Sequence, residues 1–283
     1  MNIETVGVVG CGQMGSGIAI LCAQVGYQTI VSEINTELLI EGMKAIDVYI
    51  EKSIHKGVLL KQDEENVHAR IKGITEIDDF SGCDLVIEAV TENIAEKRKV
   101  FAELDRVCPP ETILASNSSC LPITELAMVT KRPEKVIGLH FINPAPVMVL
   151  LELVTTILSS EETVRTVKAF GESLGKSVIV VRDEPGYVLN RLMVPFILDA
   201  IRLLETGVAT REDIDMSLVF GCSHPMGPLR LADFIGLDTL CSAADALYHE
   251  YKDRRFAPPL SLKRMVAARH MGRKTGKGFY EYD

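Results

Sequence analysis

The first fifteen residues constrain the fold of this chain more than any other segment. The run Thr5-Val6-Gly7-Val8-Val9 is rich in β-branched residues and predicts a buried parallel strand. It leads into Gly10, Gly12 and Gly15, which have the G-x-G-x-x-G spacing. In such a turn the first glycine permits a tight reversal, the second lets a pyrophosphate approach the backbone, and the third lets the next helix pack closely on the sheet. The phosphates would then meet the N–H groups at the positive end of that helix.

The next segment supplies the helix, strand and acid that a dinucleotide site needs. Apolar residues recur at helical spacing over 16–25, and Gly26 ends the predicted helix. A second strand follows at 29–32, with Glu33 at its end. A carboxylate at this point accepts hydrogen bonds from a ribose 2′-OH and repels a 2′-phosphate. We therefore expect NAD rather than NADP as the coenzyme; the alternative is a structural turn followed by a solvated surface acid.

The composition excludes several classes of protein. The chain has 283 residues, which is long enough for two domains, and it is 47% hydrophobic and 24% charged, as globular proteins are. A net charge of −9 argues against nucleic acid or an anionic membrane as partners. Seven cysteines without a C-x-x-C pair indicate no disulfide framework and fit the reducing cytoplasm. The amino terminus enters the first strand directly, so we expect no cleaved targeting peptide. We also expect no membrane span and no metal ion.

Strand and helix patterns alternate through the first two-thirds of the chain. This order is typical of an α/β fold with a doubly wound, Rossmann-type sheet. After Pro185-Gly186 only helical periods remain, so we expect an NAD-binding domain at 1–183 and a smaller all-α domain at 184–283. The segment 187–205 reads as a long helix, bent at Pro195 and apolar on most faces. Such a helix must be buried, either by its own domain or by a second subunit, and we expect a homodimer formed through the C-terminal domain. The other expected strands are 84–90, 112–115, 136–141, 149–154 and 177–181, with a helix at 95–107.

One histidine and one glutamate form a candidate proton relay. His140 lies near the end of an apolar strand, Glu152 lies in the following strand, and the turn 143–146 with two prolines joins them. If this turn folds the strands back on each other, the two side chains become cross-strand neighbours. An imidazole titrates near neutral pH and can take a proton, and a carboxylate behind it orients the ring and stabilises the imidazolium. A hydrogen-bonded core histidine beside a strand-edge glutamate is the structural alternative.

Longer motifs then make the chain recognisable. They are Gly10-Cys11-Gly12-Gln13-Met14-Gly15, Ala115-Ser116-Asn117-Ser118-Ser119, His140-Phe141-Ile142-Asn143-Pro144, Pro185-Gly186-Tyr187-Val188-Leu189-Asn190-Arg191, His224-Pro225-Met226-Gly227-Pro228 and Lys274-Thr275-Gly276-Lys277-Gly278-Phe279-Tyr280. With these motifs in this order, the chain resembles the L-3-hydroxyacyl-CoA dehydrogenases over essentially its full length. Within that family it is most similar to the single-function bacterial type that acts on 3-hydroxybutyryl-CoA.

The resemblance implies NAD-dependent oxidation of a (3S)-3-hydroxyacyl-CoA, with a short acyl chain, to the 3-ketoacyl-CoA, and the reverse reaction. His140 would be the general base and Glu152 its orienting partner. Ser119 and Asn190 would hold the substrate oxygen. The dinucleotide would meet Gly10, Gly12, Gln13, Met14, Gly15, Glu33, Glu92, Lys97, Asn117, Ser119, Asn143 and Lys274, and the CoA substrate would meet Lys56, Ser119 and Asn190.

Several of these residues also have structural explanations. Ser119 is a candidate helix cap, Asn190 a polar anchor in a buried helix, and Lys274 a surface lysine. A solvated basic face on the helix after Glu33 would account for Lys52, Lys56 and Lys61.

Two other functions remain open at this point. One is an NAD-dependent dehydrogenase of a free hydroxy acid, either the β-hydroxyacid type, which uses a lysine instead, or a gulonate type that shares the histidine motif. The other is a non-enzymatic dinucleotide-binding protein. Cys120, Ile142 and Ala145 depart from the usual family motifs and leave the acyl-chain preference open. The direction and pathway of the reaction depend on the cell and are also left open by the sequence.

Overall fold

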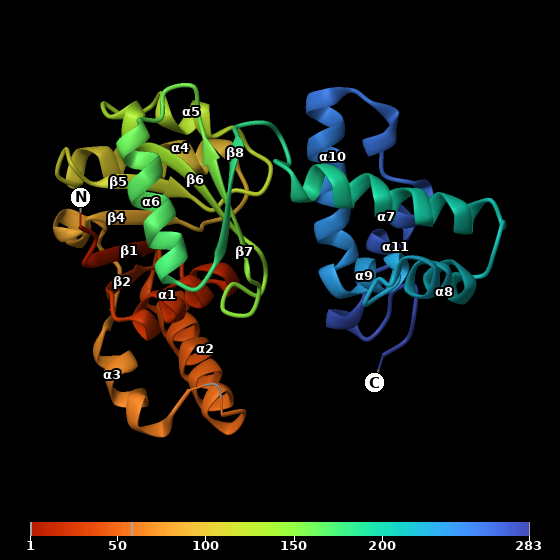
Figure 1. Cartoon of the computed structure of the whole chain (residues 1–283), viewed down its shortest axis with the longest axis horizontal. Coiled ribbons are helices and arrows are strands. Elements are labelled where there is room, and N and C mark those ends of the chain that lie inside the picture. The colour runs from red at the N-terminus through yellow and green to blue at the C-terminus, as the bar shows by residue number, and fades with distance from the viewer. Residues whose placement is uncertain (1, 58, 283) are drawn as a thin grey trace. The chain divides into compact units, whose positions relative to one another are not determined.

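The computed structural model describes residues 2–57 and 59–282, which form two compact units (Figure 1). The first unit is Met1–Asp183 and the second is Glu184–Asp283. Each unit has its own hydrophobic core, and each is described by itself below.

The first unit is built on an eight-stranded sheet with the strand order β3-β2-β1-β4-β5-β6-β7-β8. All neighbouring strands are parallel except β6 and β7, which are antiparallel. The predicted doubly wound α/β class is confirmed, and β3 is a strand that the sequence patterns did not reveal. The strands are β1 (Thr5–Val9), β2 (Gln28–Ser32), β3 (Ile71–Ile74), β4 (Leu85–Glu88), β5 (Ile113–Ser116), β6 (Val136–Phe141), β7 (Leu150–Thr155) and β8 (Ser177–Arg182).

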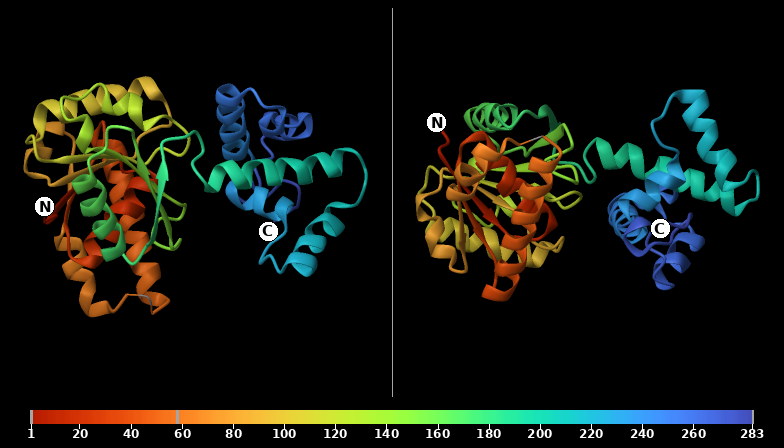
Figure 2. Two further views of the ribbon diagram at one scale, coloured as in Figure 1. Left: turned by 45° about the horizontal axis from the view of Figure 1, so that its top comes forward. Right: turned by 90° about the horizontal axis from the view of Figure 1, so that it is seen from below.

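Helices cover both faces of this sheet (Figure 2). One face packs with α1 (Gln13–Val25), α2 (Thr36–His55), α3 (Glu64–Ala69) and α6 (Glu161–Ser173) in a single core. On the opposite face, Gly7 lies against Phe80 of the 3₁₀ turn Ile77–Gly82, and Gly138 lies against Ile123, where α5 (Ile123–Ala127) begins. Helix α4 (Ile94–Val107) contacts both α5 and that 3₁₀ turn. Since side chains alternate along a strand, each strand of the sheet contributes to both layers.

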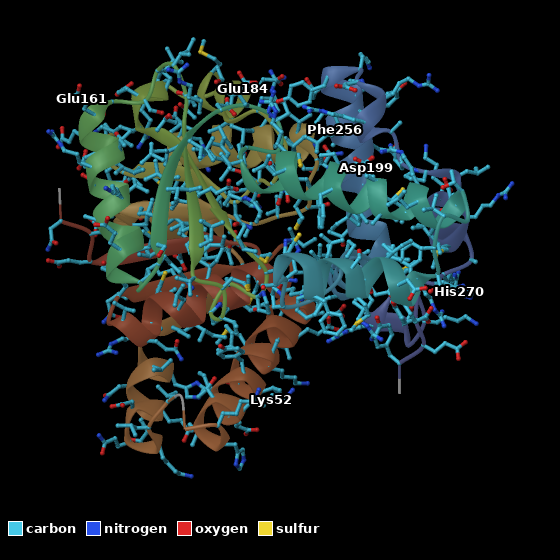
Figure 3. All side chains as sticks on the ribbon, turned by 45° about the vertical axis from the view of Figure 1, so that its right-hand side comes forward. Lys52, Glu161, Glu184, Asp199, Phe256 and His270 are labelled. Atoms are coloured by element: carbon cyan, nitrogen blue, oxygen red, sulfur yellow. The ribbon has the colours of Figure 1, made fainter. Side chains whose placement is uncertain are left out.

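The basic residues after Glu33 do not all lie on one helix, contrary to the prediction. Helix α2 carries Lys52 in its last turn (Figure 3). Lys56 is the residue that follows the carboxyl end of this helix, and both lysine side chains are exposed. Lys61 begins a separate 3₁₀ turn, Lys61–Asp63. Gly57, with φ of +68°, follows Lys56 and turns the chain away, because a left-handed residue ends a helix.

The second unit consists of helices, with isolated bridges at its carboxyl-terminal tail. Its long helix begins at Leu189 rather than at 187, because Gly186 and Tyr187 both take positive φ. The side chain of Asp233 accepts hydrogen bonds from the amides of Phe279 and Tyr280 and so ties down the tail. The helices are α7 (Leu189–Glu205), α8 (Arg211–Cys222), α9 (Pro228–Ile235), α10 (Leu237–Tyr251) and α11 (Leu260–Ala267). No helix among the described residues has the length and apolar character needed to cross a membrane.

The apolar composition of helix α7 predicts that the helix is buried, but within its own unit only part of its surface is covered. Val194, Ile197 and Ile201 are in the core, whereas Leu192 is 69% exposed and Leu203 is 45% exposed. The helix is therefore two-sided, with apolar side chains also on its outer face.

Candidate active site

The glycine turn has the geometry that a pyrophosphate requires. Gly10 has φ of +97°, and a Cβ there would lie 2.9 Å from the carbonyl oxygen of Ala89. A Cβ on Gly15 would overlap the carbonyl oxygen of Gly10, whereas a Cβ on Gly12 would meet nothing within 4 Å. The open side of Gly12 lies at the amino end of α1, whose first N–H groups have no partner inside the helix. The residues present therefore fit a dinucleotide phosphate at this turn.

Glu33 is held against the glycine turn. Its Oε1 accepts a hydrogen bond of 2.8 Å from the backbone amide of Cys11, and its Oε2 accepts one of 3.1 Å from the amide of Ile34. These two bonds fix the carboxylate at the end of β2, where the sequence predicts recognition of the ribose.

A cavity of about 510 Å³ lies beside the glycine turn in the first unit. Its wall includes Gly12, Gln13 and Glu33 on one side and Asn143 on another. It continues along α2 to Tyr49, and Lys56 lies seven residues further, on the same helical face. The glycine turn, Asn143 and the α2 face thus border one continuous space.

His140 and Glu152 are paired as predicted. Strand β6 runs antiparallel to β7 with His140 opposite Glu152 in the register. The His140 Nδ1 lies 2.7 Å from the Glu152 Oε2, and the side chains are only 6% and 0% exposed. With Nδ1 donating its proton to the carboxylate, a neutral ring has its lone pair on Nε2. The pair can therefore take up a proton at Nε2 and share the resulting charge with the carboxylate.

Carboxylates fix the backbone of the loop that carries Ser119. The Glu92 Oε1 accepts hydrogen bonds from the Ser118 hydroxyl and from the amides of Ser119 and Cys120. Asp183 accepts hydrogen bonds from the first two amides of α5, so Ser119 is not the cap of that helix. The half-buried Ser119 side chain is thus presented by a loop tied down on both sides.

Asn117 joins this loop to the strand of the histidine. Its side-chain oxygen accepts a hydrogen bond of 2.9 Å from the backbone amide of Phe141, next to His140. The loop of Ser119 and the end of β6 are therefore neighbours.

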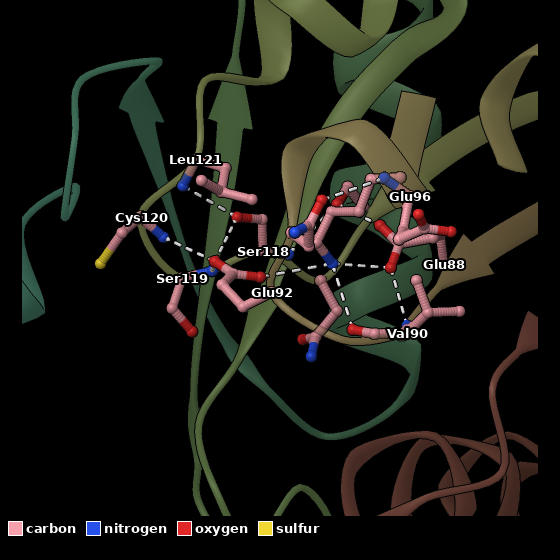
Figure 4. Close-up of polar contacts among 12 residues, drawn as sticks. Glu88, Val90, Glu92, Glu96, Ser118, Ser119, Cys120 and Leu121 are labelled. Atoms are coloured by element: carbon pink, nitrogen blue, oxygen red, sulfur yellow. Dashed lines mark hydrogen bonds and ion pairs between the residues drawn. The ribbon is translucent and has the colours of Figure 1, made fainter. Parts of the chain in front are cut away.

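Lys97 forms ion pairs with Glu88 and Glu92, and Figure 4 shows these two carboxylates beside the loop of Ser119. The Lys97 Nζ is 2.6 Å from the Glu88 Oε1 and 3.3 Å from the Glu92 Oε2, and the lysine side chain is 1% exposed. The Glu88 Oε2 accepts a 2.6 Å hydrogen bond from the Ser116 hydroxyl. This network links the carboxyl ends of β4 and β5. The glycine turn follows the carboxyl end of the parallel strand β1, so it lies at the same edge of the sheet, which is called the coenzyme edge below.

Two predicted site residues belong to the second unit. Asn190 is the second residue of α7. The Lys274 Nζ forms an ion pair of 2.6 Å with Asp238 in the same unit. The structure therefore describes these two residues only within their own unit.

Sequence reasoning did not single out three residues that hold this region in place, namely Glu88, Asp183 and Lys176. The Lys176 Nζ donates hydrogen bonds to the carbonyl oxygens of Ala145 and Met148 in the turn after β6. A glutamate inside an apolar strand was the available signal for Glu88, since a buried charge requires a partner. Within residues 2–57 and 59–282, no three His, Cys, Asp or Glu side chains are grouped so that they could hold a metal ion.

Family models match nearly the whole chain. Residues 5–184 match the 3-hydroxyacyl-CoA dehydrogenase NAD binding domain, and residues 186–282 match the 3-hydroxyacyl-CoA dehydrogenase C-terminal domain. The chain belongs to the 3-hydroxyacyl-CoA dehydrogenase family. It is an oxidoreductase, and NAD is its coenzyme.

Several relatives match this chain over nearly its full length. A 3-hydroxybutyryl-CoA dehydrogenase of Mycobacterium tuberculosis is 45% identical over 282 residues, which is 99% of each chain. The crystal structure of M. tuberculosis FadB2 matches with a TM-score of 0.98 and 44% identity over 100% of both chains. That of the (S)-3-hydroxybutyryl-CoA dehydrogenase PaaH1 from Ralstonia eutropha matches with a TM-score of 0.94 and 42% identity, again over 100% of both chains.

Proposed function

We propose that this dehydrogenase interconverts (3S)-3-hydroxybutyryl-CoA and acetoacetyl-CoA. The names of the relatives from M. tuberculosis and R. eutropha support this substrate. The observation that carries the chemistry is the 2.7 Å hydrogen bond between the His140 Nδ1 and the Glu152 Oε2 near the coenzyme edge of the sheet.

In this mechanism the residues of the chain move the proton and hold the oxygen. NAD, when bound, accepts the hydride from C3 of the substrate. His140 takes the hydroxyl proton on Nε2, and Glu152 stabilises the imidazolium through Nδ1. The Ser119 hydroxyl and the Asn190 amide hold the substrate oxygen. In the reverse direction His140 returns the proton to the oxygen of the ketone.

The α2 face is proposed to receive the CoA portion of the substrate. The cavity extends from the glycine turn along α2 to Tyr49, and the exposed Lys56 at the end of that helix supplies a cation for a CoA phosphate. The dinucleotide is proposed to meet the glycine turn with Gln13 and Met14, then Glu33, Glu92, Asn117 and Asn143. Lys97 and Lys274 complete this proposed set.

The test is the loss of 340 nm absorbance when the protein is mixed with NADH and acetoacetyl-CoA. We expect turnover with this thioester and none with small free oxo acids. In His140→Ala, the turnover should fall by ~10²–10⁴-fold while NADH still binds. Near-normal turnover in the variant would overturn the assignment of the base. Activity on the free acids alone would indicate the gulonate type of dehydrogenase instead, and NADH binding without turnover would favour a non-enzymatic role.

We also propose a homodimer formed through the second unit. Its outer surface carries exposed apolar side chains on α7 and α8, among them Leu192, Leu203, Met216 and Phe220, which is 77% exposed. Exposed apolar side chains of this size are common at protein interfaces. Sedimentation at micromolar concentration should show a dimer, and Phe220→Asp should shift it towards the monomer. A wild-type monomer would refute this proposal.

A cytoplasmic location is proposed from the thiols. No disulfide joins any of the seven cysteines, all of which lie in the described part of the chain, and six of the seven are buried. This pattern suits a reducing compartment.

A further inference from the structure

Glu88, Ser116, His140 and Glu152 point to the same face of the sheet. In β4 the core between the sheet and α1 takes Leu85 and Ile87, and in β6 it takes Leu139 and Phe141. Because side chains alternate along a strand, Glu88 next to Ile87 and His140 between Leu139 and Phe141 point to the opposite layer. Glu88 pairs in register with Ser116, and Ser116 pairs with Gly138, two residues before the histidine. Glu88 and His140 are therefore two strands apart, roughly 10 Å across the sheet.

Each hydrogen-bond partner of the two carboxylates beside Lys97 has a hydrogen to donate. Glu88 accepts from the Lys97 ammonium, the Val90 amide and the Ser116 hydroxyl. Glu92 accepts from one hydroxyl and two amides through Oε1, and it pairs with Lys97 through Oε2.

With both carboxylates and the ammonium ionised, the cluster of Glu88, Glu92 and Lys97 carries one net negative charge. The ion pairs nearest to it along α4, Lys99 with Glu96 and Arg98 with Glu125, are each neutral. Glu88 and Lys97 are 0% and 1% exposed, so solvent screens this charge less than it screens a surface charge. The charge lies beside the loop of Ser119, next to the strand of His140.

We propose that this cluster raises the affinity of the enzyme for the oxidised coenzyme relative to the reduced one. The inference rests on the proposed function, in which the dinucleotide would meet Glu92 and Asn117 and the substrate reacts beside His140. Oxidised NAD carries a positive charge on its nicotinamide ring and the reduced form does not. A net negative charge at the coenzyme edge stabilises the first form relative to the second, and it equally stabilises the positive charge that develops when hydride leaves NADH. The site is thereby biased towards reduction of the ketone.

The experiment measures the dissociation constants of NADH and NAD⁺, the first by its fluorescence and the second by competition with NADH. Glu92→Gln keeps an oxygen for the loop amides but removes one negative charge. We expect the ratio of the NAD⁺ constant to the NADH constant to rise about three- to tenfold, which is the order expected when one unit charge near the ring is removed at an effective dielectric constant between those of protein and water. Glu88→Gln, which removes the buried charge instead, should shift the ratio in the same direction.

Two control variants separate charge from shape. Glu92→Asp keeps the charge, so the ratio should stay at the wild-type value even if both affinities fall. Glu103→Gln makes the same charge change on the exposed side of α4 and should leave the ratio unchanged. An unchanged ratio in both Glu92→Gln and Glu88→Gln overturns the proposal, as does an equal shift in Glu92→Asp. A wild-type protein that binds neither coenzyme would refute the proposed function instead.

Discussion

At the scale of single residues, the proposed chemistry depends on a carboxylate that is buried away from water. Glu152 is 0% exposed, and its contact at 2.7 Å is the imidazole of His140. Burying a carboxylate costs free energy unless a partner compensates its charge. In the proposed mechanism the imidazole becomes positively charged when it takes the proton, and its attraction to the carboxylate is then strongest.

Glu152→Gln tests this use of the charge. The amide oxygen of glutamine can still accept the Nδ1 hydrogen bond, so the ring keeps its orientation, but the imidazolium loses its counter-charge. We expect kcat to fall by at least ~10-fold and up to ~10³-fold, with an unchanged dissociation constant for NADH. A decrease of less than about threefold would show that the carboxylate only orients the ring.

Glu33→Gln tests the choice of coenzyme. The substitution keeps an acceptor for the Cys11 amide, which now bonds Oε1 at 2.8 Å, and removes the charge that repels a 2′-phosphate. The preference for NADH over NADPH, measured as the ratio of the two kcat/KM values, should fall by about tenfold or more. Glu37→Gln, in the first turn of α2, is the matched control and should leave the ratio as it is.

Two buried pairs, His140 with Glu152 and Lys97 with Glu88, show which contacts can be predicted from the sequence. The pairing of His140 with Glu152 was predictable because one short turn sets the register of the two strands. The pairing of Lys97 with Glu88 was not, because one residue ends a strand and the other lies on a helix. No periodicity relates positions in two different elements, so the buried state of Lys97 emerges only from the fold.

At the scale of elements, the long regular segments were predictable and the short ones were not. Strands β1 and β6 have the predicted bounds, because their apolar runs are continuous and a glycine or proline turn follows each. Strand β3 reads Ile71-Lys72-Gly73-Ile74 and was missed, because four residues with a lysine and a glycine carry little strand signal. Its place at the edge of the sheet explains how it tolerates them.

A buried lysine holds the turn between β6 and β7, and its replacement tests that role. The Lys176 Nζ donates to the carbonyl oxygens of Ala145 at 2.6 Å and Met148 at 2.8 Å. Burial lowers the pKa of Lys176, but a neutral amine still has two N–H groups to donate. In Lys176→Met, both carbonyls lose their donor, so the free energy of unfolding should fall by about 1–3 kcal/mol in urea titrations.

The same variant should also affect substrate binding. Ala145 and its neighbours in the turn line the cavity, so a looser turn should raise the KM for acetoacetyl-CoA more than it changes kcat. Lys168→Met is the matched control, since Lys168 is exposed on α6 and pairs with Glu172. It should alter stability by no more than about 0.5 kcal/mol. Equal effects of the two substitutions would argue against the role of Lys176.

At the scale of the whole molecule, the change in residue pattern near 185 corresponds to a real difference in architecture. The sheet and its helices end at Asp183, which caps α5, and the helical unit begins at Glu184. Alternating patterns before this point and helical periods after it were visible in the sequence. The exposure of Leu192 and Leu203 on α7 was not, because it depends on which face the remaining helices of the second unit cover.

The first unit also contains four buried thiols that make the stability of the molecule depend on pH. Burial raises the pKa of Cys11 and Cys108 to about 11 and that of Cys83 to about 12, and it raises the pKa of Cys22 further. In the unfolded chain these thiols ionise near pH 9. Below that pH, neither state loses thiol protons, so the thiols add no pH dependence. Above it, the unfolded chain releases protons that the folded chain retains, and the free energy of unfolding falls as the pH rises towards the folded pKa.

The predicted loss is about 1 kcal/mol for each thiol between pH 8 and pH 10, measured as the change in unfolding free energy from urea titrations at the two pH values. Cys22→Ala removes one of these thiols, so its loss over this interval should be smaller than that of the wild type by that amount, whatever the substitution does to the stability at pH 8. Cys222→Ala is the matched control, since Cys222 is exposed, and it should retain the full wild-type dependence. If Cys22→Ala and Cys222→Ala lose the same amount as the wild type, the alkaline sensitivity arises from tyrosine and lysine side chains rather than from the buried thiols.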